Sequence, residues 1–261
     1  MSHTPLSGTR SAVGGIAALG STAGGVLSAV SGVPHQMAGV LRHRFPTVAV
    51  TGMSGVGKSR LIDRLTRHTS LADDEAGSAV MEKRTRRGRR GKGFRFRVVP
   101  GDNAATRLRA LDDVFYDDPV DGVIHVVAYG YATPRPRIGT IAPQTREELL
   151  QAELEDWTIT AHRIAAMAVR RDRPVWLMIV VTKTDLFAGD LDAALAYYSP
   201  GSGTPFGDKL DELRALAGGA RISVDVVATS VPTANDAAAT KRADAQLTAL
   251  DRRMGQLSGH H

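Results

Sequence analysis

The sequence predicts an α/β fold in which a mostly parallel sheet carries helices on both faces. Two largely apolar runs have the length and composition of buried strands, at residues 123–128 and 174–181, and residues 222–227 form the last expected strand. Helical patterns follow these runs, at residues 145–171, 191–198, 209–217 and 235–257. Strands that alternate with helices are typical of a parallel sheet, because each helix returns the chain to the same sheet edge.

Two further segments complete the expected sheet. Residues 46–51 form a short apolar strand, and residues 83–99 alternate as a hairpin with its turn near residues 90–93. Thr145 and Glu148 form a capping box at the start of the long helix. Residues 69–82 and 132–143 are expected to be loops. The 261 residues suffice for one such domain, and the absence of cysteine excludes disulfides and fits a cytoplasmic protein.

A glycine-rich motif lies between the first strand and the next helix. Residues 52–59 read Gly-Met-Ser-Gly-Val-Gly-Lys-Ser and fit the pattern G-x-x-x-x-G-K-[ST]. Backbone N–H groups and the helix dipole favour a phosphate anion at such a junction, so an ordinary glycine turn is the weaker interpretation. We expect Lys58 to reach the β- and γ-phosphates and Ser59 to ligate Mg²⁺. The predicted nucleotide contacts are Gly52, Ser54, Gly55, Val56, Gly57, Lys58, Ser59 and Arg60.

The residues after two later strands indicate which base is bound. Thr182-Lys183-Thr184-Asp185 follows the strand that ends at Val181. A carboxylate there can accept two hydrogen bonds from the N1–H and N2–H₂ edge of guanine, and adenine offers no such donor pair. The stem of Lys183 can cover the ring. Helix capping by Asp185 is the alternative. After the last strand, Thr229, Ser230 and Val231 can present a backbone N–H to guanine O6.

Together these motifs resemble the small-GTPase-like branch of P-loop GTPases, over roughly residues 45–257. The resemblance implies a P-loop NTPase three-layer sandwich at residues 45–258, with GTP or GDP and Mg²⁺ as ligands. It also implies hydrolysis of GTP to GDP and phosphate. In that family a threonine in a mobile loop closes on Mg²⁺ and the γ-phosphate. Thr85, expected just before the first hairpin strand, fits this role, and Thr69 is the alternative.

The third motif departs from the family pattern. The family carries Asp-x-x-Gly at a strand end, whereas this chain reads Val98-Val99-Pro100-Gly101 and lacks the aspartate. The Pro-Gly pair is similar to that of bacterial polarity GTPases of gliding motility. Asp102 stands where many members carry a water-orienting glutamine, and a short carboxylate positions water poorly. The resemblance therefore implies γ-phosphate sensing by Gly101 and slow intrinsic hydrolysis. Arg107 is a weak candidate for an arginine in cis, and a surface role is expected for it.

Basic residues crowd the hairpin at residues 83–97, in a chain of net charge +6. Cations on an edge strand can simply discourage pairing between sheet edges. The functional alternatives are a protein effector or regulator, an anionic membrane surface, or RNA. Phe94 and Phe96 alternate with Arg95 and Arg97 and are expected to face the core, which disfavours nucleic acid.

The first 44 residues form a Gly/Ala-rich leader with no charged residue between Ser11 and Leu41. Its apolar residues recur at helical spacing, and Gly20 and Gly24 form a small-xxx-small pair. A loosely helical leader is the favoured interpretation, since its glycines cost helix stability. A helix that touches the inner face of the membrane or joins a homo-oligomer is the alternative.

The sequence thus predicts a GTP-dependent switch with slow hydrolysis. Two alternatives stay open. One is a GTP-binding assembly subunit with little hydrolysis, which Val98 and Asp102 favour. The other is a P-loop ATPase or kinase, which residues 182–185 disfavour.

Overall fold

The computed structural model describes residues 45–66, 81–87, 93–101, 104–133, 145–230 and 237–259. Among these residues, six strands form one sheet in the order β2-β3-β1-β4-β5-β6. All neighbouring strands pair in parallel except β2 and β3, which form the predicted antiparallel hairpin. The strands are β1 (Thr47–Thr51), β2 (Glu82–Arg87), β3 (Gly93–Val98), β4 (Gly122–Val127), β5 (Val175–Val181) and β6 (Ile222–Ala228).

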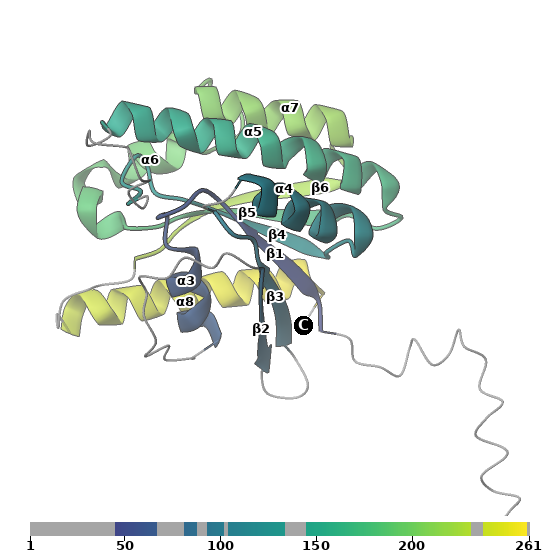
Figure 1. The fold of residues 1–261 in the computed structure, drawn as a ribbon. Helices are drawn as coiled ribbons and strands as arrows, with labels where there is room; N and C mark the ends of the chain where they lie inside the picture. Colours follow the sequence, from purple (N-terminus) through teal and green to yellow (C-terminus); the bar gives the residue numbers. More distant parts are fainter. Residues whose placement is uncertain are drawn as a thin grey trace, which may run out of the picture. The chain divides into compact units, whose positions relative to one another are not determined.

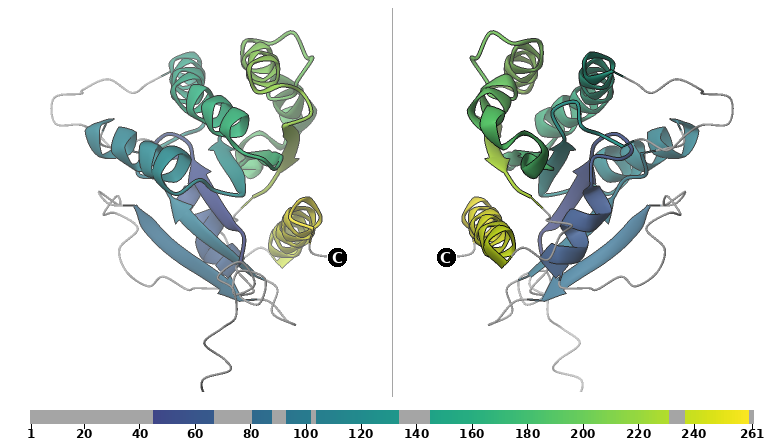
Figure 2. Two further views of the ribbon diagram at one scale, coloured as in Figure 1. Left: turned by 90° about the vertical axis from the view of Figure 1, so that its right-hand side faces the viewer. Right: turned by 90° about the vertical axis from the view of Figure 1, so that its left-hand side faces the viewer.

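Helices cover both faces of this sheet, which confirms the predicted three-layer α/β class (Figure 1). Figure 2 shows α8 on the opposite side of the sheet from α5 and α7. With α8, α3 covers one face, and the remaining helices lie on the other. The helices are α3 (Lys58–Thr66), α4 (Ala104–Asp112), α5 (Arg146–Arg170), α6 (Leu191–Tyr197), α7 (Pro205–Ala217) and α8 (Ala237–Leu257), with the π-helical turn η2 (Asp113–Asp117) and the 3₁₀ helix η3 (Thr184–Asp190).

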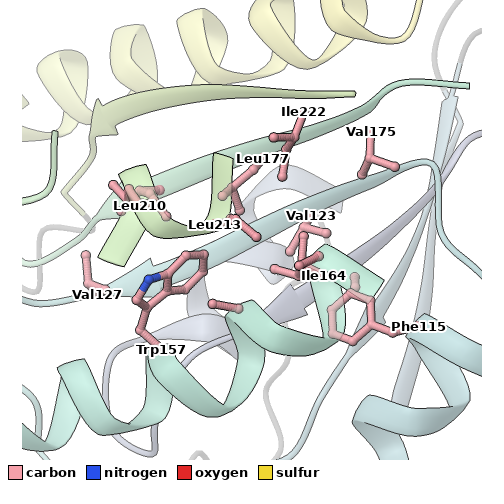
Figure 3. Close-up of a cluster of buried hydrophobic side chains, with 14 of the residues drawn as sticks. Phe115, Val123, Val127, Trp157, Ile164, Val175, Leu177, Leu210, Leu213 and Ile222 are labelled. Carbon is pink, nitrogen blue, oxygen red and sulfur yellow. The ribbon is translucent and has the colours of Figure 1, made fainter. Parts of the chain in front are cut away.

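The core between the sheet and α5 includes the ring of Trp157 (Figure 3). This ring is fully buried and stacks on Phe206 of α7, with ring centroids 5.4 Å apart. Apolar residues of α5 recur every three or four positions toward the sheet, as the helical pattern predicts. The same buried stripe also contains two carboxylates, Glu153 and Asp156.

The helix α4 and the turn η2 were not expected from the sequence. Within α4, Arg107 is 9% exposed and its guanidinium lies 2.5 Å from a carboxylate oxygen of Asp156 on α5. It also approaches the hydroxyl of Thr160 at 3.3 Å. The expectation of a surface role for Arg107 is therefore wrong. Because α4 packs along α5, Arg107 faces Asp156, whose carboxylate compensates its charge.

Most of the described arginines in the hairpin form ion pairs with carboxylates. Phe94 and Phe96 are buried, as expected. On the same face Arg84 and Arg86 form ion pairs with Asp63 and Asp251, respectively. Arg97 is buried on the other face, where it pairs with Asp113 and Asp118. Exposed cations also occur in the hairpin at Lys83, Arg87 and Arg95.

The leader predicted for residues 1–44 lies outside the described residues, so its boundary and helical character stay predictions. None of the helices in the described ranges combines the length and apolar character needed to cross a membrane.

Candidate nucleotide-binding site

Five connecting segments meet at the carboxyl edge of the parallel strands. The register pairs Thr51 with His125, Val127 with Val181, and Val181 with Ala228, so these strands end at one level. The glycine motif follows β1, the Pro-Gly segment follows β3, and residues 128–133 follow β4. The segments at 182–185 and 229–230 follow β5 and β6. Ligands of open parallel sheets bind outside this edge.

The glycine motif forms a loop that ends where α3 begins. Its first residue, Gly52, has a φ of +127°, and a Cβ there would overlap the carbonyl oxygen of Val126 in β4. Only glycine fits this position. Lys58 is buried, and its Nζ donates to the carbonyls of Gly52 and Met53, at 2.8 Å each. The ammonium group therefore lies at the mouth of the loop.

Gly101 lies against this loop. A Cβ at position 101 would come 2.7 Å from the backbone nitrogen of Ser54 and 2.9 Å from Nζ of Lys58. The chain lacks the aspartate of the Asp-x-x-Gly pattern but retains its glycine, and this glycine lies next to the predicted phosphate-binding residues. Val98, which stands where the sequence resemblance implies an aspartate, is buried among apolar side chains of the α3 face.

The segment after β5 is tied to the glycine loop by Thr182. Its hydroxyl donates to the carbonyl of Val56 at 2.6 Å, across 126 residues of sequence. Lys183 adopts a left-handed conformation with a φ of +56°. Burial and the nearby Arg60 cation lower the pKa of its ammonium group, while Glu153 and Asp185 act in the opposite direction. Asp185 is exposed at the start of η3.

The segment after β6 lies next to this one. The backbone nitrogen of Thr229 donates to Val181 O at 2.8 Å, which continues the β5–β6 ladder. Its hydroxyl oxygen is fully buried and has no hydrogen-bond partner within the described part of the chain. Ser230 donates its backbone N–H to the side chain of Gln246 at 2.9 Å.

Sequence reasoning missed the loop of residues 128–133. Its Thr133 nitrogen donates to Gly55 O of the glycine loop at 3.1 Å. On the other side, Nζ of Lys183 donates to Tyr131 O at 2.8 Å and to the Thr133 hydroxyl at 3.1 Å. The loop therefore joins the two predicted nucleotide motifs. A Tyr-Gly-Tyr run directly after a buried strand, at residues 129–131, was the signal in the sequence.

The expected position of Thr85 is wrong. It lies inside β2, exposed, rather than before that strand. The register places Thr85 opposite Arg95, which is opposite Thr47, the first residue of β1. The glycine motif follows the other end of β1, four residues or about 13 Å away at the rise of a parallel strand. The hairpin register therefore places Thr85 near the amino end of β1, too far from the glycine motif to contact a phosphate there.

Several other predicted positions lie outside the described residues. They are the alternative Thr69, the water-positioning candidate Asp102, and Val231. Their roles stay predictions.

The described donor set fits magnesium only together with a nucleotide. Within the described ranges no three acidic or histidine side chains gather as a metal site. Ser59 offers one half-buried hydroxyl at the start of α3. Mg²⁺ commonly takes few protein ligands and completes its shell with phosphate oxygens and water. Ser59 would therefore hold a magnesium ion that arrives with the phosphates.

No protein-family model matches the chain, and no curated protein matches its sequence. Solved structures do match its fold. The mammalian SRP receptor aligns over 81% of this chain and 99% of its own, at 15% identity and a TM-score of 0.50. An NFeoB structure from S. thermophilus bound to GDP·AlF₄⁻ aligns over 78% of this chain and 64% of its own, at 17% identity and a TM-score of 0.42.

A variant of SsGBP aligns over 91% of this chain and 65% of its own, at 14% identity and a TM-score of 0.45. This chain therefore spans less than two thirds of the NFeoB and SsGBP structures. At such identities the likeness is one of fold: the chain has the α/β fold of P-loop GTPase structures.

Proposed function

We propose that this protein binds GTP and GDP at the carboxyl edge of its sheet and acts as a slow, Mg²⁺-dependent GTPase switch. The observation that carries the proposal is the hydrogen bond of 2.6 Å from Thr182 to Val56. This hydrogen bond joins the segment that we predict to recognise guanine to the loop that we predict to bind the phosphates. One ligand with a guanine base and a phosphate tail accounts for both segments and for their contact.

Each residue has a chemical role in this proposal. The N–H groups of residues 52–59 and the Lys58 ammonium hold the phosphates, and Ser59 holds the magnesium ion. Asp185 accepts from the base and Lys183 covers it. The backbone N–H groups of Thr229 and Ser230 already donate to Val181 and Gln246, so of the three predicted donors to O6 only Val231 is kept in this proposal. Gly101 contacts the γ-phosphate, so the Pro-Gly segment responds to GTP and not to GDP. The bound metal neutralises charge that develops on the phosphates during transfer.

Three features of the chain support the proposal of slow hydrolysis. Val98 cannot hold a metal-bound water, because its side chain is apolar and buried. Asp102 is a short anion where a neutral water-orienting group is usual. Arg107, the cation in cis that the sequence offered, is paired with Asp156 in the core. A partner that supplies a cation or orients the water would accelerate the reaction.

Nucleotide binding and turnover test the proposal directly. Calorimetry should show tight binding of GTP and GDP, with no detectable binding of ATP, and Mg²⁺ should support slow release of phosphate from GTP. Lys58→Ala should abolish binding, and Lys209→Ala, a substitution on the exposed surface of α7, serves as the matched control. A preference for ATP would refute the guanine assignment.

The same experiment separates a second candidate function. Val98 in place of the family's aspartate also favours a GTP-binding subunit that hardly hydrolyses its ligand and acts in assembly. Tight GTP binding without phosphate release, together with nucleotide-dependent self-association in light scattering, would favour that function over a switch.

The exposed cations of the hairpin define a candidate partner surface, formed by Lys83, Arg87 and Arg95. All three side chains are exposed, and none forms an ion pair with another described residue. Because this surface is continuous with β3, which leads into the Pro-Gly segment, a partner there would respond to the bound nucleotide. We propose an anionic membrane surface as this partner.

Flotation with phosphatidylcholine vesicles, with and without phosphatidylserine, tests the membrane proposal. Binding that needs phosphatidylserine and is lost in Lys83→Glu/Arg87→Glu/Arg95→Glu supports it. Lys209→Glu, which also reverses one surface charge, should leave flotation unchanged. Binding that ignores lipid charge would instead point to apolar contact with the bilayer, and no binding to either vesicle would favour a protein effector or a second copy of the chain.

A further inference from the structure

The loop at residues 128–133 holds an uncommon backbone conformation. Tyr129 has a φ of +52° and Gly130 a φ of +75°. A positive φ is disfavoured for a tyrosine, so surrounding contacts must hold it there. One such contact is Arg146, whose guanidinium lies 4.3 Å from the centre of the Tyr129 ring and whose Nε donates to Tyr129 O at 3.3 Å.

The buried carboxylate of Glu153 supplies the other contacts. One oxygen accepts from the backbone nitrogen of Ala128 at 3.0 Å, and the backbone of Gly130 also bonds to this carboxylate. The other oxygen accepts from the hydroxyl of Tyr198. That hydroxyl in turn accepts from the backbone nitrogen of Tyr129 at 3.1 Å. Glu153 and Tyr198 therefore satisfy three consecutive N–H groups of the strained turn.

The same loop also contacts both predicted nucleotide motifs. Thr133 is bonded to Gly55 of the phosphate loop, and the Tyr131 carbonyl accepts from Lys183 of the base segment. A change at Glu153 would therefore affect both motifs through one short loop. Glu153 itself belongs to neither motif.

We propose that Glu153 is a positioning residue for the nucleotide site, and that it slows nucleotide release by holding the loop of residues 128–133 against Gly55 and Lys183. The inference rests on the proposed binding of guanine nucleotide. It names a residue that acts through the loop and does not touch the ligand.

The ionisation of Glu153 gives this role a distinctive signature. Burial raises its pKa to about 7, against the opposing hydrogen bonds from Tyr198, Ala128 and Gly130. The charged or titratable groups that interact with it are Asp156 on α5, Lys183 after β5, and Tyr197 and Tyr198 at the end of α6. An ionised carboxylate accepts from all three donors, whereas a protonated one must itself donate through one oxygen. Release should therefore quicken as the pH falls through about 7.

The test measures the dissociation rate of a fluorescent GDP analogue from the full chain between pH 6 and 8.5. For the wild type we expect faster release at the acidic end. Glu153→Gln should release the analogue about tenfold faster than the wild type at pH 8.5, a change of about 1.4 kcal/mol, and should show little pH dependence. Glu155→Gln makes the same chemical change at an exposed position of the same helix and should behave as the wild type.

Tyr198→Phe provides a second, milder variant. It removes one donor to the carboxylate, which should raise the pH at which release quickens while leaving a pH dependence in place. Wild-type rates and wild-type pH dependence in both Glu153→Gln and Tyr198→Phe would overturn the inference and leave nucleotide binding intact. Failure of the wild type to bind any guanine nucleotide would instead overturn the proposed function, and this inference with it.

Discussion

The backbone of Gly101 lies against the ammonium group of Lys58. A methyl group at position 101 would come within 2.9 Å of Nζ and within 2.7 Å of the Ser54 nitrogen. These two residues come from the ends of different strands, β3 and β1, which are neighbours in the sheet. The contact makes the Pro-Gly segment a direct neighbour of the γ-phosphate position in the proposed site.

Gly101→Ala should therefore weaken GTP binding more than GDP binding. The added methyl group would displace the segment from Ser54 and Lys58, and only GTP carries the phosphate that contacts this segment. We expect the ratio of the two dissociation constants to change by about tenfold, roughly 1.4 kcal/mol, in a fluorescence titration. Gly219→Ala, where a Cβ meets nothing within 4 Å, is the control. Equal losses for both nucleotides would contradict the assignment.

Asp185→Asn should weaken the binding of both GTP and GDP. The variant replaces one acceptor oxygen by an NH₂ donor that faces the donors of guanine, and hydrogen bonds to charged groups contribute about 1.5–3 kcal/mol. Dissociation constants should rise by at least about tenfold. Asp190→Asn lies in the same η3 helix, is exposed, and makes no side-chain capping bond, so it should have no effect. Unchanged affinity in Asp185→Asn would mean that the base lies elsewhere.

Asp156→Asn should destabilise the fold itself. It would leave the Arg107 cation buried without its carboxylate, which typically costs about 3–5 kcal/mol. A double substitution, Arg107→Met with Asp156→Leu, should recover most of that loss, because both charges leave the core together. Urea denaturation followed by circular dichroism measures the difference. Lys209→Ala, which breaks an exposed ion pair with Glu212, should barely shift the transition. An undiminished stability in Asp156→Asn would argue against the buried pair.

Stability should fall at acidic pH through His125. This side chain is fully buried, its Nδ1 lies 2.9 Å from the Thr51 hydroxyl, and burial first, then Arg107 and Lys58, lower its pKa well below 6.5. The unfolded chain binds a proton below about pH 6.5 that the folded chain does not, so unfolding becomes easier by up to about 1.4 kcal/mol per pH unit.

The comparison with His125→Asn isolates this contribution, because Glu153 acts in the opposite direction. Its raised pKa means that the folded protein holds a proton which the unfolded chain loses above its ordinary pKa, so stability falls as pH rises toward 7. The stability difference between wild type and His125→Asn should vanish progressively below pH 6.5. The exposed His162→Gln should leave the pH profile of the wild type in place. A difference that does not change with pH would show that His125 does not titrate as described.

The sequence by itself determined the fold class and the local form of the glycine motif. These depend on signals that neighbouring residues carry: continuous apolar runs for buried strands, helical spacing for α5, the capping box at Thr145, and a motif contained within residues 52–59. The capping box and the strand–loop–helix order are observed as predicted.

Only the tertiary structure decided how that site is held together. The position of Thr85 depended on the hairpin register, which the sequence pattern did not specify. The burial of Arg107 depended on α4, an unpredicted helix, packing along α5. The loop of residues 128–133 is held by hydrogen bonds between distant residues. Tyr198 bonds to Glu153, 45 residues away, and to Tyr129, 69 residues away. Such contacts arise when separate elements pack, so no local pattern of residues encodes them.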